Sequence, residues 1–280
     1  MKHDADLEQS VSMFETGRSP ATASRMDPRF SFCTYVPTSF SRRGTRRYPL
    51  AVIVHGSERS MERYRDQFVD FAEEHQAAVL CPLFPVNALY QGDLHSYKLL
   101  RGHGVRYDEI LLDMVDEFAS KYPIERGKFL LYGFSGGGQF SHRFLYAHPD
   151  RLRGVAIGAP GTVTLIDEAA DYWVGTNGFQ ALFGKPVDVG AIRKVAVQML
   201  IGEDDLRTRW CEVRPTDQTF WMPGANSTGI TRVARMEALR DNFESHGIAV
   251  DYRTFPHVAH EDDEMLGDVK AFFARSLTEP

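Results

Sequence analysis

The feature that constrains the fold most is the segment 128–138, where an apolar run ends in Gly-Phe-Ser-Gly-Gly-Gly. A helical pattern follows at once, with an apolar face made of Phe140, Phe144 and Leu145. The segment therefore predicts a strand, a tight turn and a helix, with the turn built on Gly133-x-Ser135-x-Gly137. Small residues on both sides of the serine allow the strand and the helix to pack closely. The serine hydroxyl is then expected at the helix N-terminus, where backbone N–H groups favour a developing oxyanion.

A phosphate-binding turn is the main structural alternative, because glycine-rich turns between a strand and a helix also bind phosphates. The turn lacks a Gly-Lys-Ser/Thr ending, and Ser135 stands where a dinucleotide-binding loop has its second glycine. A pattern with three fixed positions also arises by chance in many chains. The context of strand, turn and helix favours a nucleophilic serine, and the rest of the chain has to supply its partners.

Strands and helices alternate from residue 48 to the end of the chain. Continuous apolar runs predict strands buried on both faces, at 48–54, 77–83, 128–134, 152–159, 195–201 and 250–255. Amphipathic patterns predict helices at 105–122 and about 231–246, with a last one after residue 260. The expected fold class is α/β, with one domain, a mostly parallel central sheet and helices on both faces.

The domain is expected to span residues 29–280 and to follow a polar N-terminal tail, residues 1–28, that lies across the body. Residues 30–37 alternate weakly and predict an edge strand. Two irregular stretches, about 162–190 and 206–228, follow strand ends, where open α/β sheets build their sites. The first is short enough to form a lid-like segment rather than a domain.

Composition excludes several classes of protein. The 280 residues carry a net charge of −6, which argues against a general nucleic-acid binder. No apolar run approaches the roughly 20 residues that span a bilayer, and the N-terminus lacks the apolar core of a signal peptide. The cysteines are widely spaced and are expected to be reduced thiols in a cytoplasmic protein; they are Cys33, Cys81 and Cys211. The expected partner is a small-molecule substrate, with no nucleic acid and no membrane, and no signal for an oligomeric state is present.

A nucleophilic serine needs a base, and the base needs an orienting acid. At a turn of this kind these follow in the order serine, acid, histidine. Asp204 and Asp205 come directly after the strand at 195–201, and His257 and His260 lie in the loop after the last strand. The two histidines stand near an acidic run, residues 261–264, which also suggests a metal site. The simpler explanation is a run of acids at the start of a helix, so no metal is expected.

These residues together resemble the α/β-hydrolase superfamily over roughly residues 48–276. The resemblance rests on His55-Gly56, on the turn around Ser135, on Gly202-x-x-Asp205 and on His260 before the last helix. Within the superfamily, the Gly-Phe-Ser-Gly-Gly-Gly turn followed by Ala-His-Pro-Asp-Arg at 147–151 is similar to the pattern of small esterases and polyester-depolymerase-like enzymes.

The resemblance implies a role for each site residue. Ser135 is the nucleophile, and His260 is favoured over His257 as the base because it precedes the acidic run. Asp205 is favoured over Asp204 as the acid because family members usually place it three residues after the glycine. The oxyanion hole would use the backbone N–H groups of Gly136 and Ser57, with His55 bracing the loop. No cofactor is implied.

The expected activity is hydrolysis of a carboxylic ester of a small, largely apolar substrate. The alternatives are a lactonase, peptidase, acyltransferase, C–C hydrolase or cofactor-free peroxidase with the same residues, or a non-catalytic ligand-binding homologue. Four aromatic residues are candidates for the pocket wall, although they would equally well pack the loops; they are Phe134, Trp173, Trp210 and Trp221. Three arginines, Arg207, Arg209 and Arg214, are expected to be solvated, with contact to an acidic substrate group as the alternative.

Overall fold

A computed structural model describes residues 15–41, 46–217 and 219–278 of the chain. They form a nine-stranded sheet in the order β1-β3-β5-β4-β8-β9-β10-β11, with β2 also paired to β3. The strands are β1 (Gly17–Arg18), β2 (Thr22–Ala23), β3 (Ser31–Val36), β4 (Leu50–Val54), β5 (Ala78–Leu83), β8 (Phe129–Phe134), β9 (Leu152–Gly158), β10 (Ala196–Gly202) and β11 (Asp251–Phe255). The remaining strands, β6 (Arg101–Gly102) and β7 (Val105–Arg106), form a separate hairpin.

The six strands from β5 to β11 in this order are parallel, which confirms the predicted sheet. Every residue of β4 and β8 is buried, as their continuous apolar sequences require. The prediction of an edge strand at 30–37 was wrong. β3 pairs antiparallel with β5 on one side and with β1 and β2 on the other, so it is flanked on both sides.

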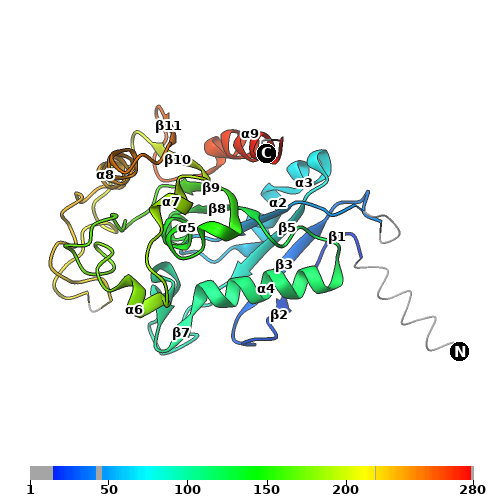
Figure 1. Ribbon diagram of the computed structural model, residues 1–280, viewed down its shortest axis with the longest axis horizontal. Helices are drawn as coiled ribbons and strands as arrows, with labels where there is room; N and C mark the ends of the chain where they lie inside the picture. The colour runs from blue at the N-terminus through cyan, green and yellow to red at the C-terminus, as the bar shows by residue number, and fades with distance from the viewer. Residues whose placement is uncertain (1–14, 42–45, 218, 279–280) are drawn as a thin grey trace, which may run out of the picture.

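Helices cover both faces of the sheet (Figure 1). One face carries α2 (Met61–Gln67), α3 (Val69–His75) and α9 (Leu266–Thr278), and the other carries α4 (Tyr107–Lys121), α5 (Gly136–Ala147) and α8 (Arg232–Ser245). On the first face, the rings of Phe68 and Phe71 lie 6.0 and 5.8 Å from that of Phe273 on α9. On the second, Tyr146 of α5 lies 5.9 Å from Phe243 of α8. Aromatic contacts thus join the helices within each of the two layers.

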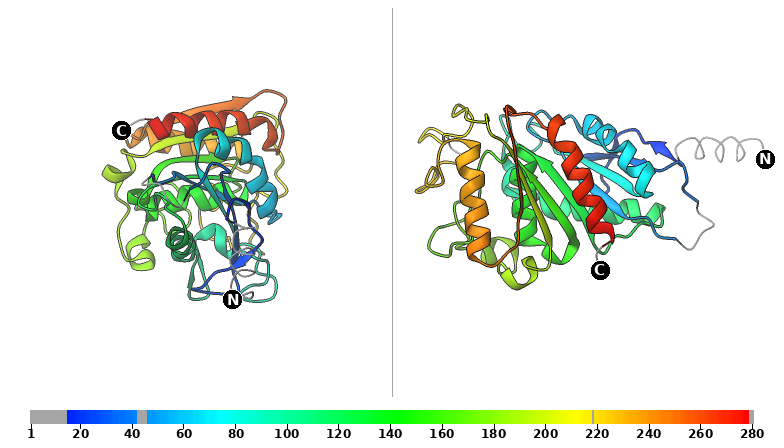
Figure 2. Two further views of the ribbon diagram at one scale, coloured as in Figure 1. Left: turned by 90° about the vertical axis from the view of Figure 1, so that its right-hand side faces the viewer. Right: turned by 90° about the horizontal axis from the view of Figure 1, so that it is seen from above.

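The N-terminal part of the chain joins the sheet before the expected domain boundary at residue 29. β1 and β2 add two short antiparallel pairings to β3, as their positions at the sheet margin in Figure 2 also show. Residues 1–14 of the predicted tail, and 42–45 of a basic turn, lie outside the described residues. None of the helices in the described ranges is long and apolar enough to cross a membrane.

The first irregular stretch, together with the residues that follow it, contains two short helices, α6 (Phe179–Phe183) and α7 (Val189–Ile192). The first and second irregular stretches pack against each other. The indole N–H of Trp173 donates a hydrogen bond of 3.0 Å to the Phe220 carbonyl oxygen, and the two rings lie 5.5 Å apart. Together with the segment η1 (Ser96–Leu99), they stand above the carboxyl ends of the strands. Two further short helical turns in the described ranges are η2 (Pro149–Arg151) and η3 (Asp263–Met265).

Candidate active site

Ser135 occupies the sharp turn between β8 and α5. Its backbone has φ 56° and ψ −110°, a conformation that costs a non-glycine residue about 1–3 kcal/mol. The Ser135 N–H donates a hydrogen bond of 2.8 Å to the Gly158 carbonyl oxygen at the end of β9, which holds the turn against the neighbouring strand. The predicted turn is therefore present, with the serine at the start of the helix.

The glycines around Ser135 are required because backbone atoms approach them closely. A Cβ atom on Gly133 would lie 2.2 Å from the Gly137 carbonyl oxygen. A Cβ atom on Gly137 would lie 2.2 Å from the Val54 carbonyl oxygen, and a Cβ atom on Gly138 would lie 2.4 Å from the Gly158 carbonyl oxygen. No side chain fits at these distances, so the glycine-rich turn is what lets α5 rest directly on β4, β8 and β9.

His260 bridges the serine and the acid. Its Nε2 atom lies 2.9 Å from Ser135 Oγ, and its Nδ1 atom lies 2.6 Å from Asp205 Oδ2. Asp205 is fully buried, whereas the alternatives Asp204 and His257 are both exposed. The arrangement therefore brings together the three residues that the sequence singled out, from the carboxyl ends of β8, β10 and β11.

A second glycine contact joins the acid to the histidine loop. A Cβ atom on Gly202, at the end of β10, would lie 2.3 Å from the Val258 carbonyl oxygen and 2.5 Å from that of Ala259. The Asp204 N–H also donates to the Val258 carbonyl oxygen at 2.9 Å. These contacts place the turn that carries Asp205 directly beside the loop that carries His260.

Arg232, the first residue of α8, completes the surroundings of Asp205. Its Nη1 atom donates a hydrogen bond of 2.9 Å to Asp205 Oδ1, and both side chains are buried. The carboxylate therefore has one oxygen on the histidine and one on the guanidinium, which fixes its plane. Sequence reasoning missed Arg232, since nothing in the pattern around residue 232 marks it as a partner of a residue 27 positions earlier.

The acidic run after His260 has a role beyond the start of a helix. Arg63 of α2 donates hydrogen bonds to Asp262 at 2.6 Å and to Asp263 at 3.1 Å. Burial raises the pKa of Asp262 even though Arg63 opposes the shift. The run thus ties the histidine loop to α2, and in the described residues no group of His, Cys, Asp and Glu is arranged to hold a metal ion.

The two residues expected to supply the oxyanion donors, Gly136 and Ser57, lie close to each other. Gly136 is the first residue of α5, and a Cβ atom on it would lie 3.2 Å from Ser57 Oγ. His55 braces the loop that carries Ser57, because the Phe84 N–H donates to its Nε2 atom at 3.0 Å and its Nδ1 atom lies 2.7 Å from the Gly56 carbonyl oxygen. Burial lowers the pKa of His55 to about 3, so this imidazole is neutral near pH 7.

A cavity of about 840 Å³ opens next to this arrangement. It reaches Gln139, whose backbone N–H donates to the Ser135 carbonyl oxygen at 3.0 Å, and thus lies within one helical turn of the serine. Its lining is mostly polar and includes His95, Lys98, Gln139, Thr162, Arg209, Trp210, Arg214 and Phe220. This lining differs from the apolar pocket that the aromatic residues predicted.

The four candidate pocket residues have different positions. Trp210 lines the cavity and is 71% exposed. Trp173 is buried between the two irregular stretches, where it packs the loops, and Trp221 is exposed outside the cavity lining. Phe134 stacks on the imidazole of His260 with 4.8 Å between ring centres. Only Trp210 among the four therefore borders this cavity.

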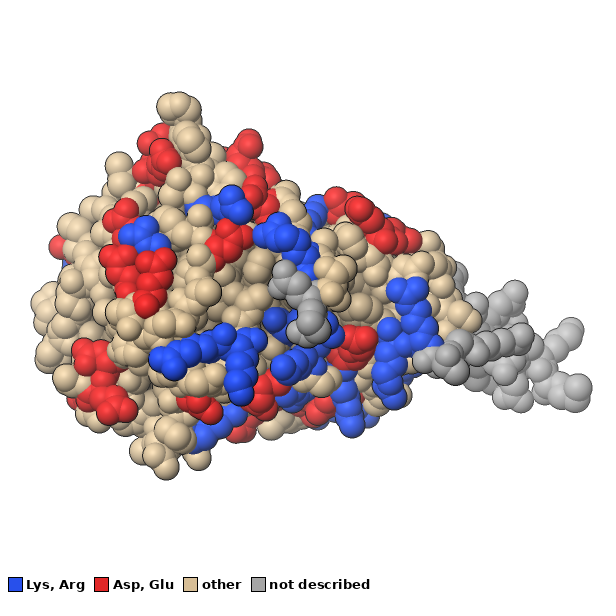
Figure 3. Space-filling model, turned by 45° about the horizontal axis from the view of Figure 1, so that its top comes forward, with Lys and Arg blue, Asp and Glu red and all other residues tan. Residues whose placement is uncertain are grey.

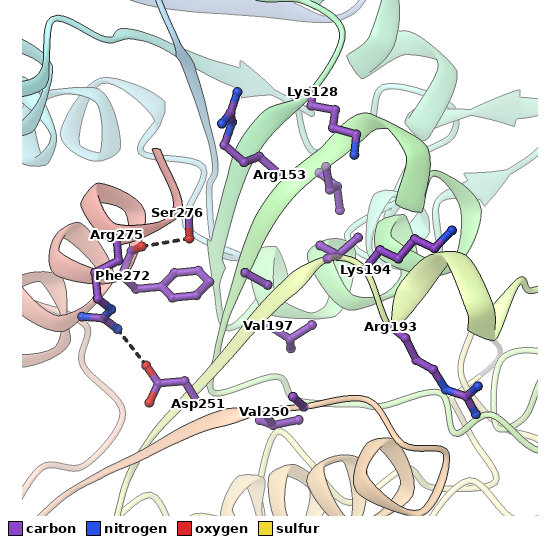
Figure 4. Close-up of a pocket in the computed structure, with 14 residues that line it drawn as sticks. Lys128, Arg153, Arg193, Lys194, Val197, Val250, Asp251, Phe272, Arg275 and Ser276 are labelled. Atoms are coloured by element: carbon purple, nitrogen blue, oxygen red, sulfur yellow. Dashed lines mark hydrogen bonds and ion pairs between the residues drawn. The ribbon is translucent and has the colours of Figure 1, made fainter. Parts of the chain in front are cut away.

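A second groove, of about 680 Å³, lies at the opposite end of the sheet (Figure 4). It borders the amino ends of β9, β10 and β11 and carries several basic side chains, with an ion pair of 3.0 Å between Arg275 and Asp251. The space-filling view shows Lys and Arg interspersed with Asp and Glu across the face that carries α9 (Figure 3). This groove is remote from Ser135 and holds none of the residues described above.

Solved structures of other proteins share this architecture. Poly(aspartic acid) hydrolase-1 from Sphingomonas sp. KT-1 superposes with a TM-score of 0.68 at 21% identity, covering 86% of this chain and 92% of that chain. LpqC, poly(3-hydroxybutyrate) depolymerase from Bordetella parapertussis, superposes with a TM-score of 0.67 at 20% identity, covering 88% of this chain and 84% of that chain. S-formylglutathione hydrolase (FrmB) from Staphylococcus aureus superposes with a TM-score of 0.60 at 12% identity, covering 94% of this chain and 98% of that chain.

At these identities the likeness concerns the fold. No model of a protein family matches the chain, and no curated protein matches its sequence. The order and direction of the strands, the turn that carries Ser135 and the structural likeness all agree with the resemblance found in the sequence. The chain has the α/β-hydrolase fold.

Proposed function

We propose that this protein is a serine hydrolase that cleaves a carboxylic ester, or a related acyl bond, through an acyl-enzyme. The observation that carries the proposal is the position of His260, which lies within hydrogen-bond distance of both Ser135 Oγ and Asp205 Oδ2. A nucleophile, a base and an orienting acid in contact are what acyl transfer by a serine requires.

In the proposed mechanism His260 accepts the proton of the Ser135 hydroxyl as its oxygen attacks the substrate carbonyl. The backbone N–H groups of Gly136 and Ser57 donate to the oxyanion that forms. His260 then gives its proton to the leaving group, and water cleaves the acyl-enzyme by the same route. Asp205, held on its other oxygen by Arg232, keeps the imidazole oriented and stabilises its positive charge.

The same site residues could cleave several types of acyl bond. The structural neighbours are named for poly(aspartic acid), poly(3-hydroxybutyrate) and S-formylglutathione, which are different acyl substrates. An ester remains our first choice, because its alkoxide leaving group needs less activation than the amine of an amide; a lactone, thioester or amide would use the same residues. A ligand-binding protein that keeps these residues would react once with a covalent inhibitor and show no steady turnover.

The test is intact mass spectrometry after treatment with a fluorophosphonate, on the wild-type protein and on Ser135→Ala. One adduct is expected on the wild type and none on the variant. Ser141→Ala is the matched control, since Ser141 lies in the same helix and is fully buried. An adduct that persists in Ser135→Ala, or that disappears in Ser141→Ala as well, would contradict the assignment of Ser135.

A further inference from the structure

Lys98 lies against the residue that follows the proposed nucleophile. It belongs to η1, the segment above the carboxyl ends of the strands, and it lines the 840 Å³ cavity. A Cβ atom on Gly136 would lie 3.1 Å from Lys98 Cε. The lysine side chain therefore passes beside the expected oxyanion site and ends in the cavity.

The Lys98 amine is buried without an acid in contact with it. The residue is 4% exposed, and its Nζ atom lies 2.9 Å from His95 Nδ1. Burial lowers the pKa of His95 to about 4, so this imidazole is neutral near pH 7 and accepts a hydrogen bond from the amine. Within the described ranges, no carboxylate lies within 4.0 Å of Lys98 Nζ. A buried ammonium without an acid is unfavourable unless something else compensates it.

Neighbouring cations increase this deficit of negative charge. Arg59 donates to the carbonyl oxygens of Phe84 and Leu94, and Arg143 donates to two threonine hydroxyls and two carbonyl oxygens. Arg232 has its acid in Asp205. Burial, followed by the charges of Arg59, Arg232 and Arg143, lowers the pKa of Lys98 to about 7. Asp217, which lines the same cavity, opposes this effect, so an anion beside Lys98 would meet an excess of positive over negative charge.

We propose that Lys98 binds a carboxylate of the substrate, so that the protein acts on an ester or amide with a free carboxylate a few bonds from the scissile carbonyl. This inference rests on the proposed hydrolase function and narrows its substrate class. A single ammonium beside a neutral imidazole matches one negative charge. A phosphate dianion would be better served by the fork of an arginine, and the arginines nearest the lysine already donate to protein oxygens.

The kinetic test compares two substrates that differ only in one charge, mono-4-nitrophenyl glutarate and its methyl ester. In the wild type, kcat/KM should be higher for the free acid. Lys98→Met should lower kcat/KM for the acid by about 10- to 100-fold, because a charge-assisted hydrogen bond is lost, and should change the methyl ester by less than about threefold. Lys128→Met is the matched control, since it removes an exposed lysine at the other end of the sheet and should leave both values unchanged.

A binding measurement separates this inference from the hydrolase proposal, because it needs no turnover. Isothermal titration calorimetry in the Ser135→Ala background should show that monomethyl glutarate binds more tightly than dimethyl glutarate. Adding Lys98→Met should weaken the binding of monomethyl glutarate by about tenfold or more and leave the binding of dimethyl glutarate unchanged. If the Lys98→Met variant does not fold, Lys98→Gln replaces it in this measurement, and thermal unfolding checks that the variant is folded.

Two results would overturn the carboxylate site. One is equal binding of the acid and the diester to Ser135→Ala protein. The other is equal binding of the acid with and without Lys98. Either result leaves the fluorophosphonate test of Ser135 untouched, and a failed fluorophosphonate test would leave the calorimetric evidence for the carboxylate site standing.

Discussion

The two ends of the sheet both carry basic side chains but use them differently. At the amino ends of β9, β10 and β11, Lys128 and Lys194 are exposed, and Arg153 and Arg275 pair with Glu125 and Asp251. At the carboxyl ends, Lys98 is buried beside Gly136, and no acid of the described residues is in contact with its amine.

The comparison shows that a charged side chain buried at a cost in free energy is a better indicator of a functional site than a high density of exposed charges. An exposed ammonium keeps its water, and an exposed ion pair contributes only about 0–1 kcal/mol. A buried ammonium without an acid has lost its water and gained little in return. The amino-end groove is therefore expected to be an ordinary hydrated surface, and the carboxyl end is expected to hold chemistry. The predictions below test this contrast.

The largest effect is expected for Ser135→Ala, which should lower kcat for an activated ester by more than about 10⁴-fold while thermal unfolding stays close to that of the wild type. The measurement is steady-state hydrolysis of 4-nitrophenyl acetate. Ser141→Ala should retain full activity. If Ser135→Ala kept its activity, the carboxyl end would lose its proposed role and the contrast with the other end would fail.

The acid should be identified by replacing the two aspartates separately. Asp205→Asn should lower kcat by about 10²- to 10⁴-fold, because the imidazole loses its orienting carboxylate. Asp204→Asn should change kcat by less than about twofold, since that side chain is exposed. Comparable losses in both variants would mean that the Asp205–His260 contact does not serve catalysis.

Arg232→Met should affect both stability and activity. Removing one partner of a buried ion pair is expected to cost about 3–5 kcal/mol in the free energy of unfolding. Loss of the guanidinium that holds Asp205 Oδ1 should also lower kcat, because the carboxylate that orients His260 is then fixed by one partner fewer.

Arg232→Lys should restore part of the lost activity, because it restores a positive charge that can donate to Asp205. Arg240→Met, in the same helix but at an exposed ion pair with Asp241, should leave both the unfolding free energy and kcat nearly unchanged. A destabilised Arg232→Met protein with an unchanged kcat would show that Arg232 stabilises the fold and has no influence on catalysis.

The preference for a free carboxylate should decline with increasing pH. Only the protonated Lys98 amine attracts a carboxylate, and its pKa in the free protein is about 7, so the protonated fraction falls as the pH rises through 7. The ratio of kcat/KM for the glutarate acid to that for its methyl ester should therefore drop between about pH 6 and 9.

Other groups around Lys98 should not produce this change in the ratio. His95 is already neutral above its pKa of about 4, and the charges of Arg59, Arg143, Arg232 and Asp217 stay constant in this range. A pH effect on the residues that cleave the acyl bond changes kcat/KM for both esters alike and cancels in the ratio. A ratio that stays flat from pH 6 to 9 would argue that the amine does not bind the carboxylate.

The smallest effect is expected at the amino-end groove. The double variant Lys128→Gln, Lys194→Gln should change the free energy of unfolding by no more than about 0.5 kcal/mol and leave both glutarate esters unaffected. Chemical denaturation and the two-substrate assay would measure this. A change in the carboxylate preference would show that long-range charge, and not Lys98, sets it.

The sequence predicted the features that depend on local pattern. Apolar runs placed the six parallel strands, and the glycines around Ser135 marked the turn, because close backbone contacts leave no other residue type there. The order serine, acid, histidine led to Asp205 and His260. The structure brings these residues into contact, and their roles in catalysis stay proposals.

Features that depend on long-range packing were not predictable in the same way. Lys98 lies in a loop without a motif, and its burial depends on α5, where the Arg143 guanidinium donates to the Lys98 carbonyl oxygen at 2.9 Å. The pairing of Arg232 with Asp205 likewise needs the fold. Aromatic residues predicted a pocket wall, but their type alone does not tell a buried packing residue such as Trp173 from one that borders the cavity.

The glycines of the turn also determine from which side the specificity of this site can be re-engineered. At positions 133, 137 and 138 an added methyl group would collide with backbone oxygen atoms, which cannot yield without moving the sheet. At Gly136 it would meet only side-chain ends, from Tyr97, Lys98 and Ser57. The side of the site at Gly133, Gly137 and Gly138 is thus fixed by backbone atoms, whereas the side at Gly136 is formed by side chains that can change. Directed evolution toward new substrates should accumulate its changes around Tyr97 and Lys98 and leave the opposite wall as it is.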